Sequence, residues 1–276
     1  MSITRHVPRL AFVVIAITTA GFALTSCSSD SSTAALPSLY SDSTATLDVA
    51  TTSGDAVSTS LETMTANEAA TLSFDVLRSA AAPTANVSVN RTKTCYDGSG
   101  AVVANCNPIS SVRKIVTHVT MDGSRSSSTS VTGGTDASWS GALHRVSNDT
   151  TVRNFSTGTT PAELSRTHSD VIVGHDTTMF TQGTTTRNHV EAYRDTVKGV
   201  TWNMPRSSNP FPVSGSIVRV DSVHVTISKA SQSETRDKVN VVEVDFPADA
   251  QGNVVIKVNA KTCSLNLVSH AVSNCK

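Results

Sequence analysis

The sequence predicts a mainly β protein: a single antiparallel β-meander domain, built as a curved sheet, a half-barrel or a sandwich, with one or two N-terminal helices. Composition is the first reason, because Thr and Val are common whereas aromatic residues make up 4% and charged residues 16% of the chain. Thr and Val suit a pleated, half-buried surface. The second reason is the pattern from about residue 86 onward, where short alternating stretches are separated by turn residues.

The N-terminus has the features of an export signal. Arg5 and Arg9 precede an apolar run at 10–24, and no acidic residue comes before Asp30. A basic start followed by a short apolar run is typical of a signal peptide, and the run is too short for a comfortable membrane span.

The apolar run ends in Leu24-Thr25-Ser26-Cys27, which resembles the bacterial lipobox. The resemblance implies that a signal peptide covering residues 1–26 is removed and that Cys27 is lipidated, so that the lipid is the protein's contact with a membrane. The alternative is an ordinary signal peptide cut near Ala23. In such lipoproteins an Asp after the Cys commonly marks inner-membrane retention, so Ser28 favours an anchor in the outer membrane of the cell envelope.

Two further segments follow from composition. Residues 27–50 are rich in Ser, Thr and Ala, which predicts a flexible tether after the lipidated Cys. Residues 51–276 form the predicted β-rich globular domain. A helical segment is expected at its start, because Val57, Leu61 and Met64 recur at helical spacing.

Several strands can be placed by alternation. Residues 137–147 and 150–156 are expected to form a hairpin around the turn at 147–150, and the apolar face of segment 216–229 changes phase near residues 221–222, which predicts a bulge. Two more strands are expected at 165–174 and 185–197. The clearest pattern is a C-terminal antiparallel meander, whose three predicted strands cover residues 242–246, 254–258 and 263–267.

The cysteines indicate two disulfides. With Cys27 assigned to the lipid, an even number of cysteines remains in an exported chain. Three pairings are possible, and we favour the local ones, Cys95–Cys106 and Cys263–Cys275. A zinc site is the alternative, but no Cys-x-x-Cys spacing occurs.

Seven His, Asp and Glu residues between positions 168 and 195 could act as metal ligands or catalytic groups. They match no recognised spacing such as His-Glu-x-x-His, and polar residues on the wet face of a sheet would give the same pattern. We therefore expect no catalytic residue, cofactor or metal, and keep a hydrolase as an alternative. The cluster consists of His168, Asp170, His175, Asp176, His189, Glu191 and Asp195.

A proline-bracketed loop at 202–212 contains Trp202 and Phe211. Large loops often carry function, so the segment could form a binding lip. The alternative is a loop folded over the edge of the core, since aromatic side chains more often bury themselves.

Charge argues against nucleic acid as a partner. Removing Arg5 and Arg9 from the 22 basic residues leaves 20, against 22 acidic residues. The leading hypothesis is a non-catalytic cell-envelope lipoprotein that binds or carries an apolar or glycan ligand. In outline a helix followed by a long meander resembles the half-barrel lipoprotein carriers, whose curved sheet holds acyl chains. The alternative is a structural or assembly partner of an envelope protein complex.

The lipid anchor gives a direct prediction. Cys27→Ala removes the acylated thiol, so the protein should be found in the soluble fraction of the envelope instead of the membrane fraction. Fractionation and immunoblotting test this, and continued membrane association of the variant would contradict the anchor.

Overall fold

The computed structural model describes residues 39–68, 84–104, 106, 111–129, 137–157 and 159–276, which belong to one compact unit. Its described part contains a single α-helix, α1 (Asp42–Glu68), and one sheet. No helix in these ranges is both long and apolar enough to cross a membrane. The strands of the sheet are β1 (Thr84–Tyr96), β2 (Val102–Val103), β3 (Lys114–Thr129), β4 (Ala137–Phe155), β5 (Glu163–Gln182), β6 (Thr185–Asn203), β7 (Ser214–Lys229), β8 (Gln232–Asp245), β9 (Asn253–Val258), β10 (Lys261–Asn266) and β11 (Val272–Ser273).

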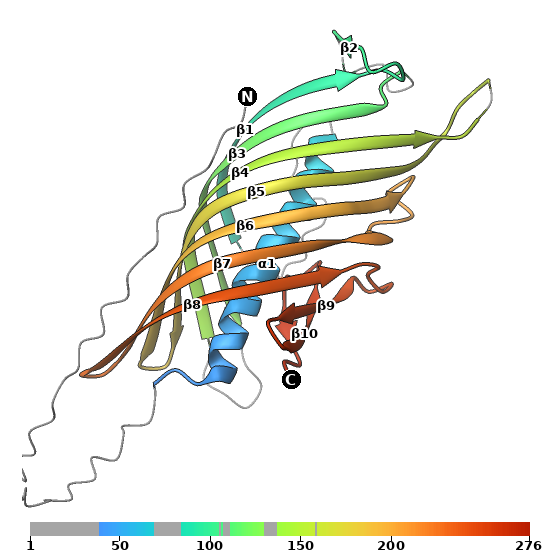
Figure 1. Ribbon diagram of the computed structural model, residues 1–276. Coiled ribbons are helices and arrows are strands. Elements are labelled where there is room, and N and C mark those ends of the chain that lie inside the picture. Colours follow the sequence, from blue (N-terminus) through green and yellow to red (C-terminus); the bar gives the residue numbers. More distant parts are fainter. Residues whose placement is uncertain (1–38, 69–83, 105, 107–110, 130–136, 158) are drawn as a thin grey trace, which may run out of the picture. The chain divides into compact units, whose positions relative to one another are not determined.

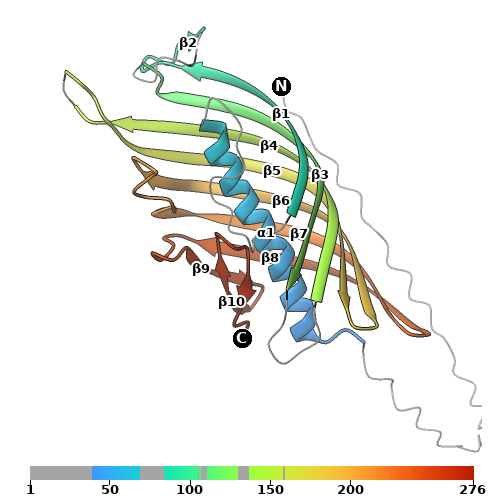
Figure 2. The same ribbon diagram turned by 180° about the vertical axis from the view of Figure 1, so that it is seen from behind.

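The sheet is an antiparallel meander, as the sequence predicts. Its order is β11-β10-β9-β8-β7-β6-β5-β4-β3-β1-β2, so that almost every strand pairs with its neighbours in the chain. The long strands β3–β8 curve around α1, and β9 and β10 approach the helix from the C-terminal end of the sheet (Figures 1 and 2). The curved sheet and its helix, and not a two-sheet sandwich, are therefore the architecture of the domain.

Tight hairpins join the long strands. Gly183 has a φ of 57° at the turn between β5 and β6, a conformation that glycine adopts without steric cost. The β7–β8 hairpin turns at Ala230 and the β9–β10 hairpin at Asn259, both with positive φ. Register is continuous along most of these pairs, because each long strand keeps one face buried.

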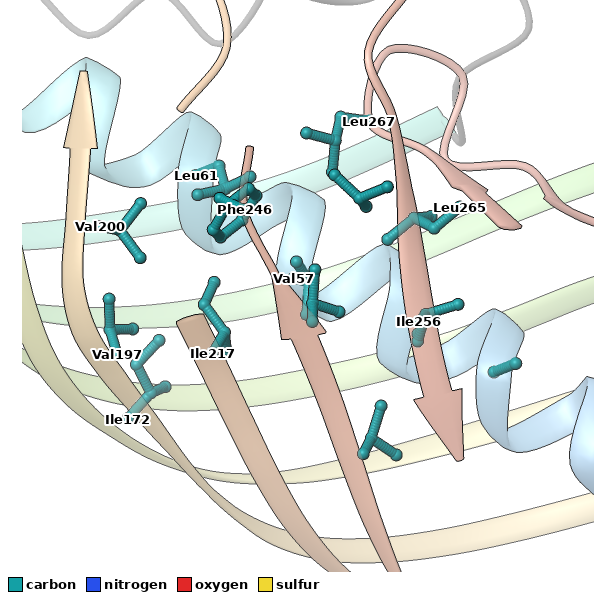
Figure 3. Packing of buried hydrophobic residues seen from close by; sticks show 14 of the residues in the cluster. Val57, Leu61, Ile172, Val197, Val200, Ile217, Phe246, Ile256, Leu265 and Leu267 are labelled. Atoms are coloured by element: carbon teal, nitrogen blue, oxygen red, sulfur yellow. The ribbon is translucent and has the colours of Figure 1, made fainter. Parts of the chain in front are cut away.

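One side of α1 packs against the C-terminal half of the sheet through apolar contacts. Val57, Leu61 and Met64 form one stripe of the helix, at the spacing that the sequence predicts. They meet side chains from β7 to β10, such as Ile217 and Ile256 (Figure 3). Each fully buried aliphatic side chain of this kind stabilises the fold by about 1.5–3 kcal/mol, so this apolar contact fixes the helix on β7–β10.

Both predicted disulfides are present with the local pairing. Cys95–Cys106 closes a loop of 11 residues beside β2, and Cys263–Cys275 closes one of 12. The second bond attaches the C-terminal tail to β10, whose Leu265 is buried in the core.

The structure corrects three expectations. The helix begins at Asp42, within the segment 27–50 predicted as a tether. The predicted turn at 147–150 is wrong, since β4 runs without interruption and Asp149 and Thr151 are buried on its inner face. The predicted bulge near 221–222 is also wrong, because β7 keeps its register with β6 and β8 throughout that region.

The reason for the last error is that charged residues occupy inward positions. Arg219 and Asp221 are buried on the same face as Ile217 and Val223, while Val220 points outward and is 47% exposed. Register shifts occur at places that the sequence did not predict, for example on the neighbouring strand β6 between Lys198 and Thr201, where Gly199 has a φ of 58°. The predicted signal peptide, Cys27 and the first part of the tether lie outside the described residues.

Candidate functional site

Three carboxylates hold α1 in the concave face of the sheet. Asp48, Asp55 and Glu62 follow one another at intervals of seven residues, which is about two helical turns, so they lie on one side of the helix. Asp48 accepts two hydrogen bonds from the Arg187 guanidinium, at 2.6 and 2.9 Å, and lies 3.3 Å from His189 Nε2. The helix is thus bound to the sheet by buried ion pairs as well as by apolar packing.

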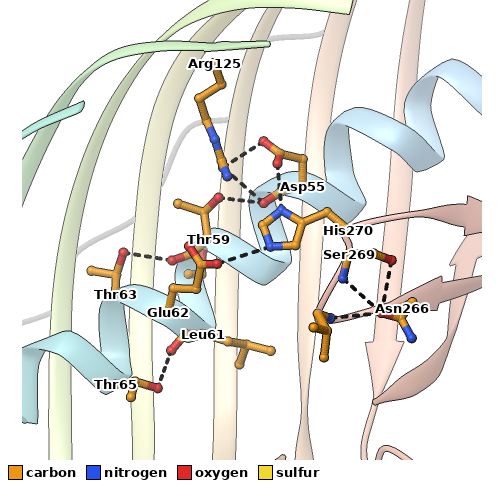
Figure 4. A network of polar contacts seen from close by, with 12 residues as sticks. Asp55, Thr59, Leu61, Glu62, Thr63, Thr65, Arg125, Asn266, Ser269 and His270 are labelled. Carbon is orange, nitrogen blue, oxygen red and sulfur yellow. Dashed lines mark hydrogen bonds and ion pairs between the residues drawn. The ribbon is translucent and has the colours of Figure 1, made fainter. Parts of the chain in front are cut away.

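The middle and last carboxylates share one imidazole. Asp55 lies 2.8 Å from Arg125 Nη1 and 2.9 Å from His270 Nδ1, and His270 Nε2 lies 3.3 Å from Glu62 Oε1 (Figure 4). Burial alone would raise the pKa of Asp55, but Arg125 and His270 outweigh it and lower that pKa. Burial would likewise lower the pKa of His270, yet the two carboxylates raise it. His270 therefore favours its charged form here.

A second group of charges surrounds Arg219 on β7. Its guanidinium lies 3.5 Å from the centre of the Tyr193 ring and 3.7 Å from carboxylate oxygens of both Glu191 and Asp195. The Tyr193 ring in turn covers Gly174, where a Cβ would approach ring atoms to 2.3 Å. Burial raises the pKa of Glu191 to about 7 and also raises that of Asp195, although Arg219 opposes both shifts.

The predicted His/Asp/Glu cluster is divided between the two faces of the sheet. His175 lies on the outer face, and the other six lie on the inner face. Those six are mostly engaged in pairs: His168 Nδ1 lies 3.0 Å from Asp149, and Asp170 accepts a hydrogen bond from Ser147. Among the described residues, no three His, Cys, Asp or Glu side chains are arranged to hold a metal ion. The inner cluster is a structural network.

The loop after β6 covers the end of the core. Trp202 is 1% exposed and its indole N–H donates to the carbonyl of Pro210. Arg206 stacks over the Trp202 ring at 3.9 Å and donates to Thr65 near the end of α1. Phe211 packs against the apolar core. Of the two interpretations of this loop, the one in which it folds over the core is confirmed.

The space between α1 and the sheet is nearly filled. Two gaps lie between the helix and strands β3–β5, and each has a volume of about 20 Å³, which is room for roughly one water molecule. Buried polar side chains line both gaps: Arg145 lines both of them, and Thr59 lines one. Neither of these two gaps could hold an acyl chain while α1 is in place.

The outer face, in contrast, carries larger hollows. One hollow of about 470 Å³ crosses β4–β8. Apolar side chains, including Ala142, Ala192 and Val190, make up most of its wall. Three imidazoles also line it, and one of them, His224, is hydrogen-bonded through Nδ1 to Asp237 at 2.7 Å.

A second hollow, of about 500 Å³, adjoins the first and shares Ala142 and Thr177 with it. Its lining is more polar than that of the first, with the amides of Asn86 and Asn188 and several hydroxyls, although carbon atoms still form the larger part of it. Ala142 and Thr177 are direct cross-strand partners on β4 and β5, so the two hollows meet along one line of side chains. We call the pair of hollows the outer trough.

One row of cross-strand partners runs through the outer trough. It spans seven strands, and at about 4.8 Å per strand its length is about 29 Å. The row could not be found from the sequence, because it depends on the register of six strand pairs; the only local signal is the small size of several members. The row is Asn86, Ser124, Ala142, Thr177, Val190, His224 and Asp237.

Comparison with known proteins adds no relatives: no family model, no curated protein and no solved structure matches the chain.

The ion pairs of α1 give the first prediction from this geometry. Asp55→Asn removes the carboxylate that the buried Arg125 contacts and one of the two carboxylates beside His270, so the free energy of unfolding should fall by about 3–5 kcal/mol. Asp42→Asn is the control in the same helix, because the Asp42 side chain is 83% exposed and should matter by less than about 1 kcal/mol. Urea unfolding of both variants tests this. Equal losses for the two would contradict the anchoring role of Asp55.

Stability should also fall as the pH rises. The pKa of Glu191 is raised to about 7, so burial disfavours its ionised form, and stability is lost as the pH rises from about 5 to above 7. The raised pKa of His270 acts in the same direction, since its stabilising charge is lost as the pH rises through that pKa.

Thermal unfolding measured from pH 5 to pH 8.5 tests this dependence. Glu191→Gln, which removes the titrating group, should flatten the curve and recover about 3 kcal/mol at the alkaline end. Glu243→Gln on the half-exposed outer side of β8 is the control and should leave the slope unchanged. A stability that rises with pH in this range would show that the sign is wrong.

Proposed function

We propose that this chain is a lipid-anchored protein of the cell envelope that binds an extended, uncharged glycan across the outer face of its sheet, without catalysis. The observation that carries the proposal is the outer trough. It is about 29 Å long and is lined by hydroxyls, amides and imidazoles, which are the groups that hydrogen-bond sugar hydroxyls.

Charge supports an uncharged ligand. Without Arg5 and Arg9 the chain has 20 basic and 22 acidic residues, and the outward side chains of the outer trough include one carboxylate, Asp237, because the neighbouring Lys238 turns inward and lies 3.7 Å from Asp42. A strongly charged polymer would need a clear excess of one sign along the groove. A neutral polyhydroxyl chain needs only donors and acceptors.

The other functions considered above are less well supported. An apolar ligand inside the curved sheet would have to displace α1, which is held there by buried ion pairs. A hydrolase would need His, Asp or Glu side chains that face a substrate, whereas those of 168–195 are mostly buried and paired.

A role in assembly has one observation in its favour. Val220, Val239 and Val241 are exposed together on β7 and β8, by 47%, 67% and 47%. Exposed apolar patches often contact proteins. Photocrosslinking groups placed in cells at positions 220 and 241, followed by mass spectrometry, would separate the two functions, since these positions line neither hollow and would capture an assembly partner, whereas Val239 lines the first hollow and does not distinguish them.

The location remains part of the proposal. The lipobox at Cys27 supports attachment to a membrane of the envelope, and Ser28 favours the outer one. A protein held at a membrane surface within the envelope would meet glycans at high local concentration.

Binding can be tested on the mature lipidated protein in detergent. We expect Thr177→Tyr, which places a large ring where the two hollows meet, to weaken the binding of neutral hexasaccharides at least tenfold in calorimetric titrations. Val173→Tyr is the matched control, because Val173 is exposed on the same face of β5 but lines neither hollow. The proposal fails if no hexasaccharide binds, or if both variants bind as the unsubstituted protein does.

A further inference from the structure

The two hollows of the outer trough differ in chemistry. The wall of the first hollow consists mostly of carbon atoms. They come from Ala142, Val190, Ala192 and Val239 and from imidazole rings. In the second hollow the apolar wall is smaller, so that polar side chains make up a larger share of the lining. Its polar side chains are Asn86, Ser124, Ser126, Ser140, Thr177 and Asn188.

The two environments are only one side chain apart. Ala142 and Thr177 belong to both hollows and face each other across β4 and β5, where Cβ atoms of cross-strand partners are about 5 Å apart. A ligand that crosses this line must therefore present an apolar group and a hydroxyl-rich surface within the width of about one sugar unit.

We propose that the ligand is an N-acetylated glycan, whose acetamido methyl groups bind in the first hollow and whose ring hydroxyls bind in the second. This inference rests on the proposed glycan-binding function and names the class of sugar. The acetamido group joins a methyl to an amide, and the first hollow offers partners for both parts.

The apolar wall of the first hollow takes the methyl. Ala192 and Val190 provide it, since both lie on the outer face of β6 and Val190 is 47% exposed. Burying one methyl of this kind is worth a roughly fourfold gain in affinity.

The rim of the same hollow takes the amide. Asp237 can accept from the amide N–H, and the Ser222 hydroxyl can donate to its carbonyl oxygen. Asp237 accepts a hydrogen bond from His224 Nδ1 at 2.7 Å, which brings these two side chains together at this end of the trough. An unsubstituted sugar, with a hydroxyl in place of the acetamido group, would leave the apolar wall in contact with water.

Two neutral ligands that differ only in this group provide the test. The hexamer of β-1,4-linked N-acetylglucosamine carries the acetamido group, and the hexamer of β-1,4-linked glucose carries a hydroxyl there. For the mature lipidated protein in detergent, calorimetric titration should show that the N-acetylated hexamer binds at least about fourfold more tightly.

Two variants locate the preference. Ala192→Gln puts a polar side chain into the first hollow, and Ala192 does not line the second; the ratio of the two affinities should therefore fall to about one. Ser126→Gln obstructs the polar hollow and should weaken both hexamers equally.

Three outcomes would overturn the inference, and one of them separates it from the proposed function. Equal binding of the two hexamers removes the acetamido preference but leaves glycan binding intact. A preference that persists in Ala192→Gln places the acetamido group elsewhere. Failure of both hexamers to bind overturns the inference together with the proposed function.

Discussion

The fold depends on the ion pairs that bind α1 within a curved sheet. A sheet bent this strongly has a concave face that must be filled, and here a helix rich in Ser, Thr and Ala fills it. Its carboxylates Asp48, Asp55 and Glu62 meet arginine and histidine side chains that the strands and the C-terminal segment direct inward. The small side chains of the helix let it lie close to the strands, and the buried charges specify its position along them.

The same arrangement explains where the sequence predicted the structure and where it could not. Strands whose inner positions are apolar, such as the one containing Val242 and Val244, were predicted correctly, and so were both disulfides, because they depend on local spacing. Strands whose inner positions are charged were misread. Arg219 and Asp221 on β7 resemble surface residues, since alternation reveals burial only when the buried residues are apolar.

The start of the helix was missed for a similar reason. Residues 42–50 carry few large apolar side chains, so composition alone indicates a tether, whereas Asp48 is in fact 2% exposed and paired with Arg187. Its partner is 139 residues away in the chain. The outer trough was equally hidden, because its row of side chains forms only when seven strands align. Long-range register, and not local propensity, determines both features.

The spacing of the carboxylates along α1 has a mechanical consequence. If the protein is held at its N-terminal end, as proposed above, a pull on the chain before α1 reaches the first turn of the helix, and the component of that pull along the helix axis loads the ion pairs. Attachment points about 10 Å apart along that axis are then strained in parallel, so that Asp48, Asp55 and Glu62 resist together and do not yield one after another. Under the proposed anchor, the helix would behave as a shear-loaded joint that keeps the domain folded while it is pulled.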